Sequence, residues 1–295
     1  MNKNLISQIS IHFDGPIAVD HSVQLRTLSK ALDNIQNSID RAYLDIKYGK
    51  IWKNATLKKE DYLPTDFVMR QTREGGFITD LIGGAGSEKI VQRIYRALLP
   101  AYEKAKNNAV IEHEKLVELA EKRIEGLRNG LQVPKDYKEI MDKPDALQTT
   151  AFGDRSIVKE FDQIASAIRA RDGDGSVIEF DFYAEKALPT LIFDEKVARN
   201  FHGVVSTRTL GDPVKIPIKL RALDSGRGVS KAKALNIISD KEFNLHIYTD
   251  RGFSSLRKYL KKRNPPIFEI VACPILEYEA FDPLAGDMYF ISVVS

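Results

Sequence analysis

The run from Ser87 to Leu131 constrains the fold more than any other part of the chain, because it predicts a long helix between two regions of different character. Apolar residues recur in it at steps of three and four, and its other faces carry Glu, Lys and Arg. The apolar stripe is thinnest between Tyr102 and Ala109, so we expect that part to stand away from any core. Pro100 removes one backbone donor and predicts a kink or a break. The run is therefore expected to be an arm that joins two compact units.

The segments on either side of this arm predict an α+β protein. The chain has 295 residues, more than one domain usually needs. We expect an N-terminal α/β domain over residues 1–86, the helical arm over 87–131, a linker over 132–150 and a strand-rich C-terminal domain over 151–295. The linker is predicted because this segment is polar and contains Pro134 and Pro144.

The N-terminal domain is expected to pack one long helix on a small sheet. Residues 5–13 alternate between apolar and polar, which predicts a half-buried strand that ends at an Asp-Gly-Pro turn. A helix capped by Asp20 or Ser22 should follow, with its apolar stripe reaching Ile46. Residues 66–73 and 77–82 predict a hairpin around the two glycines at 75 and 76. The helix should bury its stripe against the sheet formed by these strands.

The C-terminal domain is expected to be a small curled antiparallel sheet or a partly open barrel. A helix that starts at Asp154 or Ser156 and an alternating strand over 177–182 introduce it. The remaining expected elements are short strands joined by glycine turns, with one basic helix inserted. The strands are expected at 201–210, 214–223, 231–238, 243–248, 267–275 and 288–294, and the helix at 253–263.

Motifs that carry chemistry are absent from the sequence. The five histidines are scattered, and the single Cys273 lies in an apolar run, where a buried thiol is the expected state. The glycine stretch at 83–87 opens a helix after a strand, but it lacks the Lys-Ser/Thr of a phosphate loop, so we interpret it as a hinge with Ser87 as the helix cap. We therefore expect no metal, no cofactor and no enzymatic activity. An enzyme whose carboxylates meet only in the fold stays open as a third hypothesis.

The segment at 171–176 resembles the start of a calcium loop in its two aspartates. The sixth and twelfth loop positions hold Val177 and Tyr183, where calcium loops need glycine and glutamate. A tight turn into the following strand is the better interpretation.

The charge of the C-terminal domain is unevenly distributed. Residues 201–264 hold 14 Lys and Arg against 5 Asp and Glu, whereas residues 265–295 hold 5 Asp and Glu and no Lys or Arg. This distribution predicts either a solvated face, offset by the acidic segment, or a binding surface for nucleic acid or an acidic protein. Aromatic residues 243, 253 and 259 fall at core-facing positions, which favours protein over nucleic acid. The candidate binding residues are Arg227, Lys231, Lys233, Arg257, Lys258, Lys261, Lys262 and Arg263.

Three segments form structural motifs near the start of the chain: Ile9-x-Ile11-x-Phe13-Asp14-Gly15-Pro16, Leu25-x-x-Leu28-x-x-x-Leu32 and Arg73-Glu74-Gly75-Gly76-Phe77-Ile78. With these segments, the first 85 residues or so resemble the opening of a family of uncharacterised bacterial and phage proteins. A strand ending in Asp-Gly, a long helix and a glycine-rich hairpin recur in that family, although Gly76 replaces its serine here. The resemblance implies structure and brings no catalytic residue with it. The size, the two compact ends and the charged arm are also similar in layout to phage anti-defence proteins such as the inhibitor of the Gabija system. This second likeness rests on layout and on no motif.

The functional hypothesis from the sequence is therefore a non-enzymatic protein that binds another protein. The layout suggests a phage or mobile-element inhibitor that blocks a bacterial antiphage defence complex by steric binding. The alternative is a nucleic-acid-binding protein that uses the basic C-terminal module. No apolar run is long enough for a signal peptide core or a membrane span, so we expect a cytoplasmic protein, in the host cytoplasm if phage-encoded, without a membrane partner. Homo-oligomerisation stays open.

Overall fold

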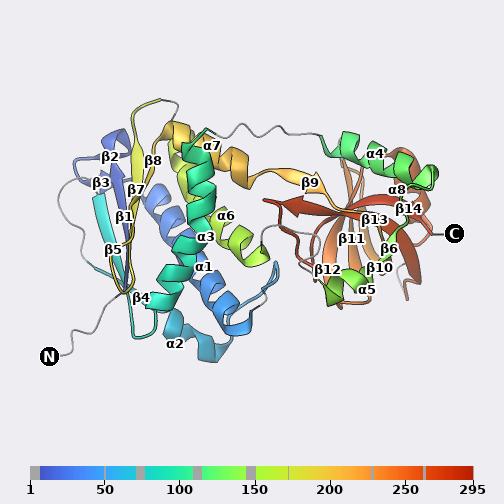
Figure 1. Cartoon of the computed structure of the whole chain (residues 1–295), viewed down its shortest axis with the longest axis horizontal. Coiled ribbons are helices and arrows are strands. Elements are labelled where there is room, and N and C mark those ends of the chain that lie inside the picture. The colour runs from blue at the N-terminus through green and yellow to red at the C-terminus, as the bar shows by residue number, and fades with distance from the viewer. Residues whose placement is uncertain are drawn as a thin grey trace. The chain divides into compact units, whose positions relative to one another are not determined.

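The computed structural model confirms an α+β protein and divides the chain into two compact units. It describes residues 7–49, 51–70, 77–108, 115–143, 151–171, 173–226, 229–261 and 264–294. The sheet–helix unit consists of Met1–Ile111 and Gly153–Ser206, and the barrel unit of Glu112–Phe152 and Thr207–Ser295. Each unit is thus assembled from two separate stretches of chain (Figure 1).

The sheet–helix unit contains a five-stranded antiparallel sheet in the order β4-β5-β1-β7-β8. The central strand β1 pairs with β5 on one side and with β7 on the other, so that Ile11 lies between Thr79 and Phe180. The strands are β1 (Gln8–Asp14), β4 (Phe67–Met69), β5 (Phe77–Gly83), β7 (Val177–Tyr183) and β8 (Leu191–Phe193), and a separate small hairpin pairs β2 (Ala18–Val19) with β3 (Ser22–Val23).

Helices cover one face of this sheet (Figure 1). The apolar residues of β1 lie on that face and are fully buried, as the alternating sequence predicts. A cluster of aromatic rings joins helix to sheet, since Phe161 lies 4.9 Å from Phe180 and 6.2 Å from Phe182 between ring centroids. The helices are α1 (Leu25–Tyr48), α2 (Tyr62–Thr65), α3 (Glu88–Lys106), α6 (Phe152–Arg169) and α7 (Glu195–Val205), with 3-10 turns at Gly15–Ile17 and Lys59–Asp61.

The expected helical arm over 87–131 is wrong. Helix α3 packs in the sheet–helix unit, where Ile94, Leu98 and Ala105 are buried, and it continues through Pro100 without a break. The next helix, α4 (Leu116–Arg128), belongs to the barrel unit. The prediction failed where the apolar stripe is sparse, because Ala101, Tyr102 and Ala105 are enough to bury that part of the helix. Residues 109–114 lie outside the described part.

The expected contiguous domains over 1–86 and 151–295 are also wrong. Helix α6, strand β7 and helix α7 complete the first unit, because β1 needs β7 on the side that β5 leaves open. Residues 201–205, expected as strand, form the end of α7, and only Arg208–Leu210 is strand β9. The helix cap expected at Asp20 or Ser22 is instead Gln24, since the two polar residues lie in the β2–β3 hairpin. The glycine turn expected at residues 75 and 76 lies outside the described residues.

The barrel unit contains a closed five-stranded barrel, which confirms the barrel-like fold expected from the sequence. The strands pair in the order β10-β11-β12-β14-β13, and β13 pairs back onto β10. One long strand closes the barrel, because β10 pairs with β13 through its first half and with β11 through its second. The strands are β10 (Val214–Asp224), β11 (Ser230–Asn236), β12 (Lys241–Ile247), β13 (Ile267–Glu277) and β14 (Met288–Val293), with β6 (Lys135–Asp136) and β9 added at the two ends of the order.

The order in which the five barrel strands are connected defines the topology of the barrel. If the barrel strands are numbered one to five along the chain, their spatial order is 1-2-3-5-4, and the third and fifth are parallel. Helix α8 (Asp250–Arg257) connects the third to the fourth. This is the connectivity of the oligonucleotide/oligosaccharide-binding barrel, a Greek-key barrel of five strands.

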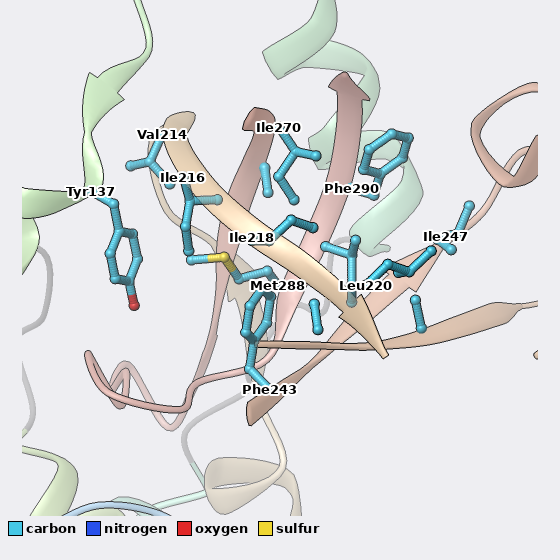
Figure 2. Packing of buried hydrophobic residues seen from close by; sticks show 14 of the residues in the cluster. Tyr137, Val214, Ile216, Ile218, Leu220, Phe243, Ile247, Ile270, Met288 and Phe290 are labelled. Atoms are coloured by element: carbon cyan, nitrogen blue, oxygen red, sulfur yellow. The ribbon is translucent and has the colours of Figure 1, made fainter. Parts of the chain in front are cut away.

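The interior of the barrel is filled with aliphatic and aromatic side chains (Figure 2). Tyr137 and Ile140 of helix α5 (Tyr137–Asp142) belong to this core, and the Tyr137 hydroxyl donates to the Pro283 carbonyl oxygen at 2.7 Å. The linker expected over 132–150 is therefore wrong for residues 132–143, which add β6 and α5 to the barrel. Residues 144–150 lie outside the described part.

Candidate nucleic-acid interface on the barrel

The candidate interface lies on the outer side of β11 and β12. Along β11 the residues alternate, with Ala232 and Ala234 buried in the barrel and Lys231 and Lys233 exposed on its outside. The two lysines are two positions apart on one strand, which separates their Cα atoms by about 7 Å. Neither lysine has an ion-pair partner among the residues that the structure describes. Both ammonium groups are therefore available to a ligand.

The neighbouring strand β12 contributes polar groups to the same face. In the antiparallel register His246 lies opposite Lys231, and Asn244 lies opposite Lys233. Asp287, which precedes β14, holds both side chains: its carboxylate is 3.3 Å from His246 Nε2 and accepts from Asn244 Nδ2 at 3.2 Å. These contacts hold His246 and Asn244 in place beside the lysines, and we call these two side chains the polar floor. The half-buried Tyr248 follows the last residue of β12, and its ring stacks on that of Tyr289 at 4.7 Å between centroids.

Strand β10 extends the basic face on the other side of β11. Its outward residues include Lys219 and Arg221, and a bulge between residues 220 and 222 places Arg221 out of register with β11. Arg221 Nε lies 3.8 Å from Glu242 Oε1, a loose and exposed pair that is worth little. Sequence reasoning missed these two residues, although the alternation of charged and apolar residues along β10 could have indicated their outward position.

The other predicted candidates form a second group at the end of α8. Arg257 ends the helix, and Lys258 and Lys261 follow it, all three exposed. The expected helix over 253–263 is wrong in its bounds, since the observed one covers Asp250–Arg257. Lys258 Nζ lies 5.1 Å from the centroid of the Tyr259 ring, and this ring stacks on Phe268 at 3.8 Å. A turn follows the helix, since the Tyr259 amide donates to the Leu256 carbonyl oxygen at 2.9 Å.

The structure thus separates the predicted candidates. Lys231 and Lys233 lie together on β11, whereas Arg257, Lys258 and Lys261 lie at the α8–β13 connection. Arg227, Lys262 and Arg263 lie outside the described residues. Phe243 is buried, and Phe253 packs against the same core, as the sequence indicated. Tyr259 is only partly buried, so a basic and aromatic surface exists there too.

A thiol, a hydroxyl and an imidazole are groups of the kinds used in catalysis, and the structure gives the surroundings of one of each among the described residues. Burial raises the pKa of the Cys273 thiol to about 12, so it is protonated at neutral pH. In the sheet–helix unit, Ser10 Oγ donates to Asp80 Oδ1 at 2.7 Å, while His12 Nδ1 lies 3.0 Å from Glu179 Oε2. The Ser10 hydroxyl and the His12 imidazole thus contact different carboxylates, those of Asp80 and Glu179. Among the described residues no cluster of His, Cys, Asp and Glu is arranged to hold a metal ion.

Comparisons with known proteins give this chain no relatives. No protein-family model matches it, and neither the curated proteins nor the solved structures provide a match. Across the described part of the chain, every helix is too short or too polar to cross a bilayer. Function must therefore be inferred from the surface of the two units themselves.

Proposed function

We propose that the barrel unit binds single-stranded nucleic acid along the outer face of β11 and β12. The observation that carries this proposal is the pair Lys231 and Lys233, exposed and without an ion-pair partner among the described residues, on the second strand of a closed barrel. Phosphate groups are the ligands that such free ammonium groups bind most readily in nucleic acids. The backbone of a strand laid along β11 would meet both lysines in turn.

The barrel connectivity supports the same face. In barrels of this plan, the second and third strands form the surface that binds oligonucleotides and oligosaccharides. The plan alone does not fix a function, because many folds serve several. The proposal therefore rests on the charges of this face and uses the connectivity as support.

A single strand fits this face better than a duplex. A polar floor formed by His246 and Asn244 lies beside the lysines, and Tyr248 offers part of an aromatic ring at the end of β12. Unstacked bases can stack on such rings or bond to such polar groups, whereas duplex bases are occupied by each other. With two lysines as its principal cations, the face predicts modest affinity that depends strongly on salt.

The test is a titration of the full chain with fluorescein-labelled oligonucleotides, read by anisotropy at two salt concentrations. Single-stranded DNA, single-stranded RNA and duplex DNA serve as probes. The double variant Lys231→Gln/Lys233→Gln should weaken binding to all single-stranded sequences alike and reduce the salt slope by about 0.7 per lost phosphate contact. The matched control is Lys186→Gln/Lys196→Gln, which removes two exposed lysines of the sheet–helix unit.

Two outcomes would refute the proposal. One is an unmeasurable affinity of the wild-type chain for every oligonucleotide at low salt. The other is equal loss of binding in the β11 variant and in its control, because only a diffuse charge effect would remain. The earlier expectation of a protein partner, and the finer one of an inhibitor of antiphage defence, stay predictions. A different surface of the barrel unit favours a protein partner.

A further inference from the structure

A groove between helices α4 and α8 lies along one edge of β14. It does not include Lys231 or Lys233, whose side of β11 we call the lysine face. Its volume is about 600 Å³, within the usual range for ligand sites. Four consecutive residues of β14, Phe290–Val293, line it together with residues of both helices. All of these residues belong to the barrel unit.

The edge of β14 in this groove lacks a neighbouring strand among the residues that the structure describes. Strand β12 pairs with β14 only at Met288 and Tyr289, whereas β14 stays paired with β13 through Val293. Val294 N donates to Glu269 O of β13 at 3.0 Å. Because successive residues of a strand direct their backbone groups to opposite sides, the amide of Val293 is directed to the groove edge. Such an edge can accept one more strand.

The groove combines apolar walls with two cationic groups. Ile124 and Leu127 of α4 supply aliphatic surface, and the edge of β14 adds Val293. Arg128, the last residue of α4, and Arg251 in the first turn of α8 are exposed and have no ion-pair partner among the described residues. Guanidinium groups bind carboxylates in a bidentate manner, which suits them to acidic side chains.

We propose that this groove binds an extended peptide segment of a partner protein, one in which acidic residues alternate with apolar ones. The peptide would add a strand to the free edge of β14 through main-chain hydrogen bonds. Its apolar side chains would pack on α4, and its carboxylates would pair with Arg128 and Arg251. The alternation follows from strand geometry, since successive side chains point to opposite faces. This inference does not depend on nucleic-acid binding at β11.

The experiment selects peptides from a random twelve-residue library displayed on phage, with the full chain immobilised as bait. The most enriched peptide is then synthesised with fluorescein and titrated with the chain. Enriched sequences should alternate acidic and apolar residues. Arg128→Gln/Arg251→Gln should weaken binding at least about tenfold, as expected for the loss of charge-assisted hydrogen bonds. The matched control, Arg26→Gln/Arg96→Gln, removes two exposed arginines of the sheet–helix unit and should change nothing.

A second pair of variants tests the added strand itself. Val293→Pro removes the amide directed to the groove and should abolish binding, whereas Val293→Ala keeps that amide and should bind within about threefold of wild type. Thermal melting by circular dichroism establishes that both variants fold. The proposal is overturned if no peptide is enriched, if the enriched peptides are basic, or if the arginine variant and a folded Val293→Pro both bind as wild type does. Loss of oligonucleotide binding in the arginine variant, without peptide enrichment, would likewise overturn it in favour of phosphate contacts.

Discussion

Phe161→Ala tests whether α6 belongs to the sheet–helix unit. The Phe161 side chain is fully buried, and its ring meets Phe180 and Phe182 of β7 at 4.9 and 6.2 Å. Truncation of a fully buried phenylalanine costs about 3–5 kcal/mol, through lost burial and the cavity left behind. A domain has only about 5–15 kcal/mol of stability. With a urea dependence of about 2 kcal/mol per M, the unfolding midpoint should fall by roughly 2 M.

The two units can be followed separately in this experiment. Trp52 is the only tryptophan of the chain and lies in the sheet–helix unit, so its fluorescence reports the unfolding of that unit. Hydrogen exchange of the β11 amides reports the barrel. Phe161→Ala should shift the Trp52 transition and leave β11 protected, and the control Phe243→Ala in the barrel core should do the reverse. An unchanged Trp52 transition with loss of protection in β11 would refute the discontinuous unit and restore the contiguous domains.

Two further predictions concern single groups. Because Cys273 is buried and its thiol pKa is raised to about 12, a thiol reagent at pH 8 should label it only after unfolding, and rapid labelling of the folded chain would contradict its placement. Hydrogen bonds from Lys47 and from the Lys58 amide lower the pKa of Asp61 below its value of about 3.9 in an unfolded chain. Its stabilisation is therefore present above about pH 4 and lost as the pH falls through the lower folded pKa, so Asp61→Asn should flatten the acid side of the stability curve measured by Trp52 fluorescence. An acid transition equally steep in the variant would contradict this role.

Local patterns predicted the elements of this fold well, because periodicity depends only on neighbouring residues. The alternating strand that became β1 and the long helix α1 are examples. The domain boundaries failed for a physical reason. A period of two shows which face of a strand is buried, but it does not show which strand pairs with it. The pairing of Ile11 with Phe180 joins positions far apart in sequence, and nothing local to either residue indicates it.

The segment at 132–143 failed for a different reason. Helix α5 has six residues, too few to show a helical period, and Pro134 lies just before it. Its apolar residues are Tyr137, Ile140 and Met141; the first two enter the barrel core, and Met141 packs against it. A short amphipathic turn between prolines therefore has the composition of a linker and the packing of a core element.

The candidate sites show the same division between local and distant information. Lys231 and Lys233 could be predicted, because they alternate with small apolar residues along one strand. Arg128 and Arg251 could not, because each lies at the end or start of a helix where an exposed charge is ordinary. Only the packing of α4 and α8 against β14 brings the two arginines to one groove.

Net charge along the sequence overstated the basic character of the C-terminal region. The barrel unit brings the basic and the acidic segments together, so that Arg208 pairs with Glu277 at 2.6 Å. Asp287 in the acidic segment fixes His246 beside the lysine face. What remains for a ligand is set by the exposed cations that have no ion-pair partner among the described residues, although Asp224 lies opposite Lys231 on the neighbouring strand. Those cations lie in two places with different surroundings, so the two surfaces suit different ligands. The polar face of β11 and β12 suits a nucleic-acid backbone, and the apolar groove beside the free edge of β14 suits an acidic peptide.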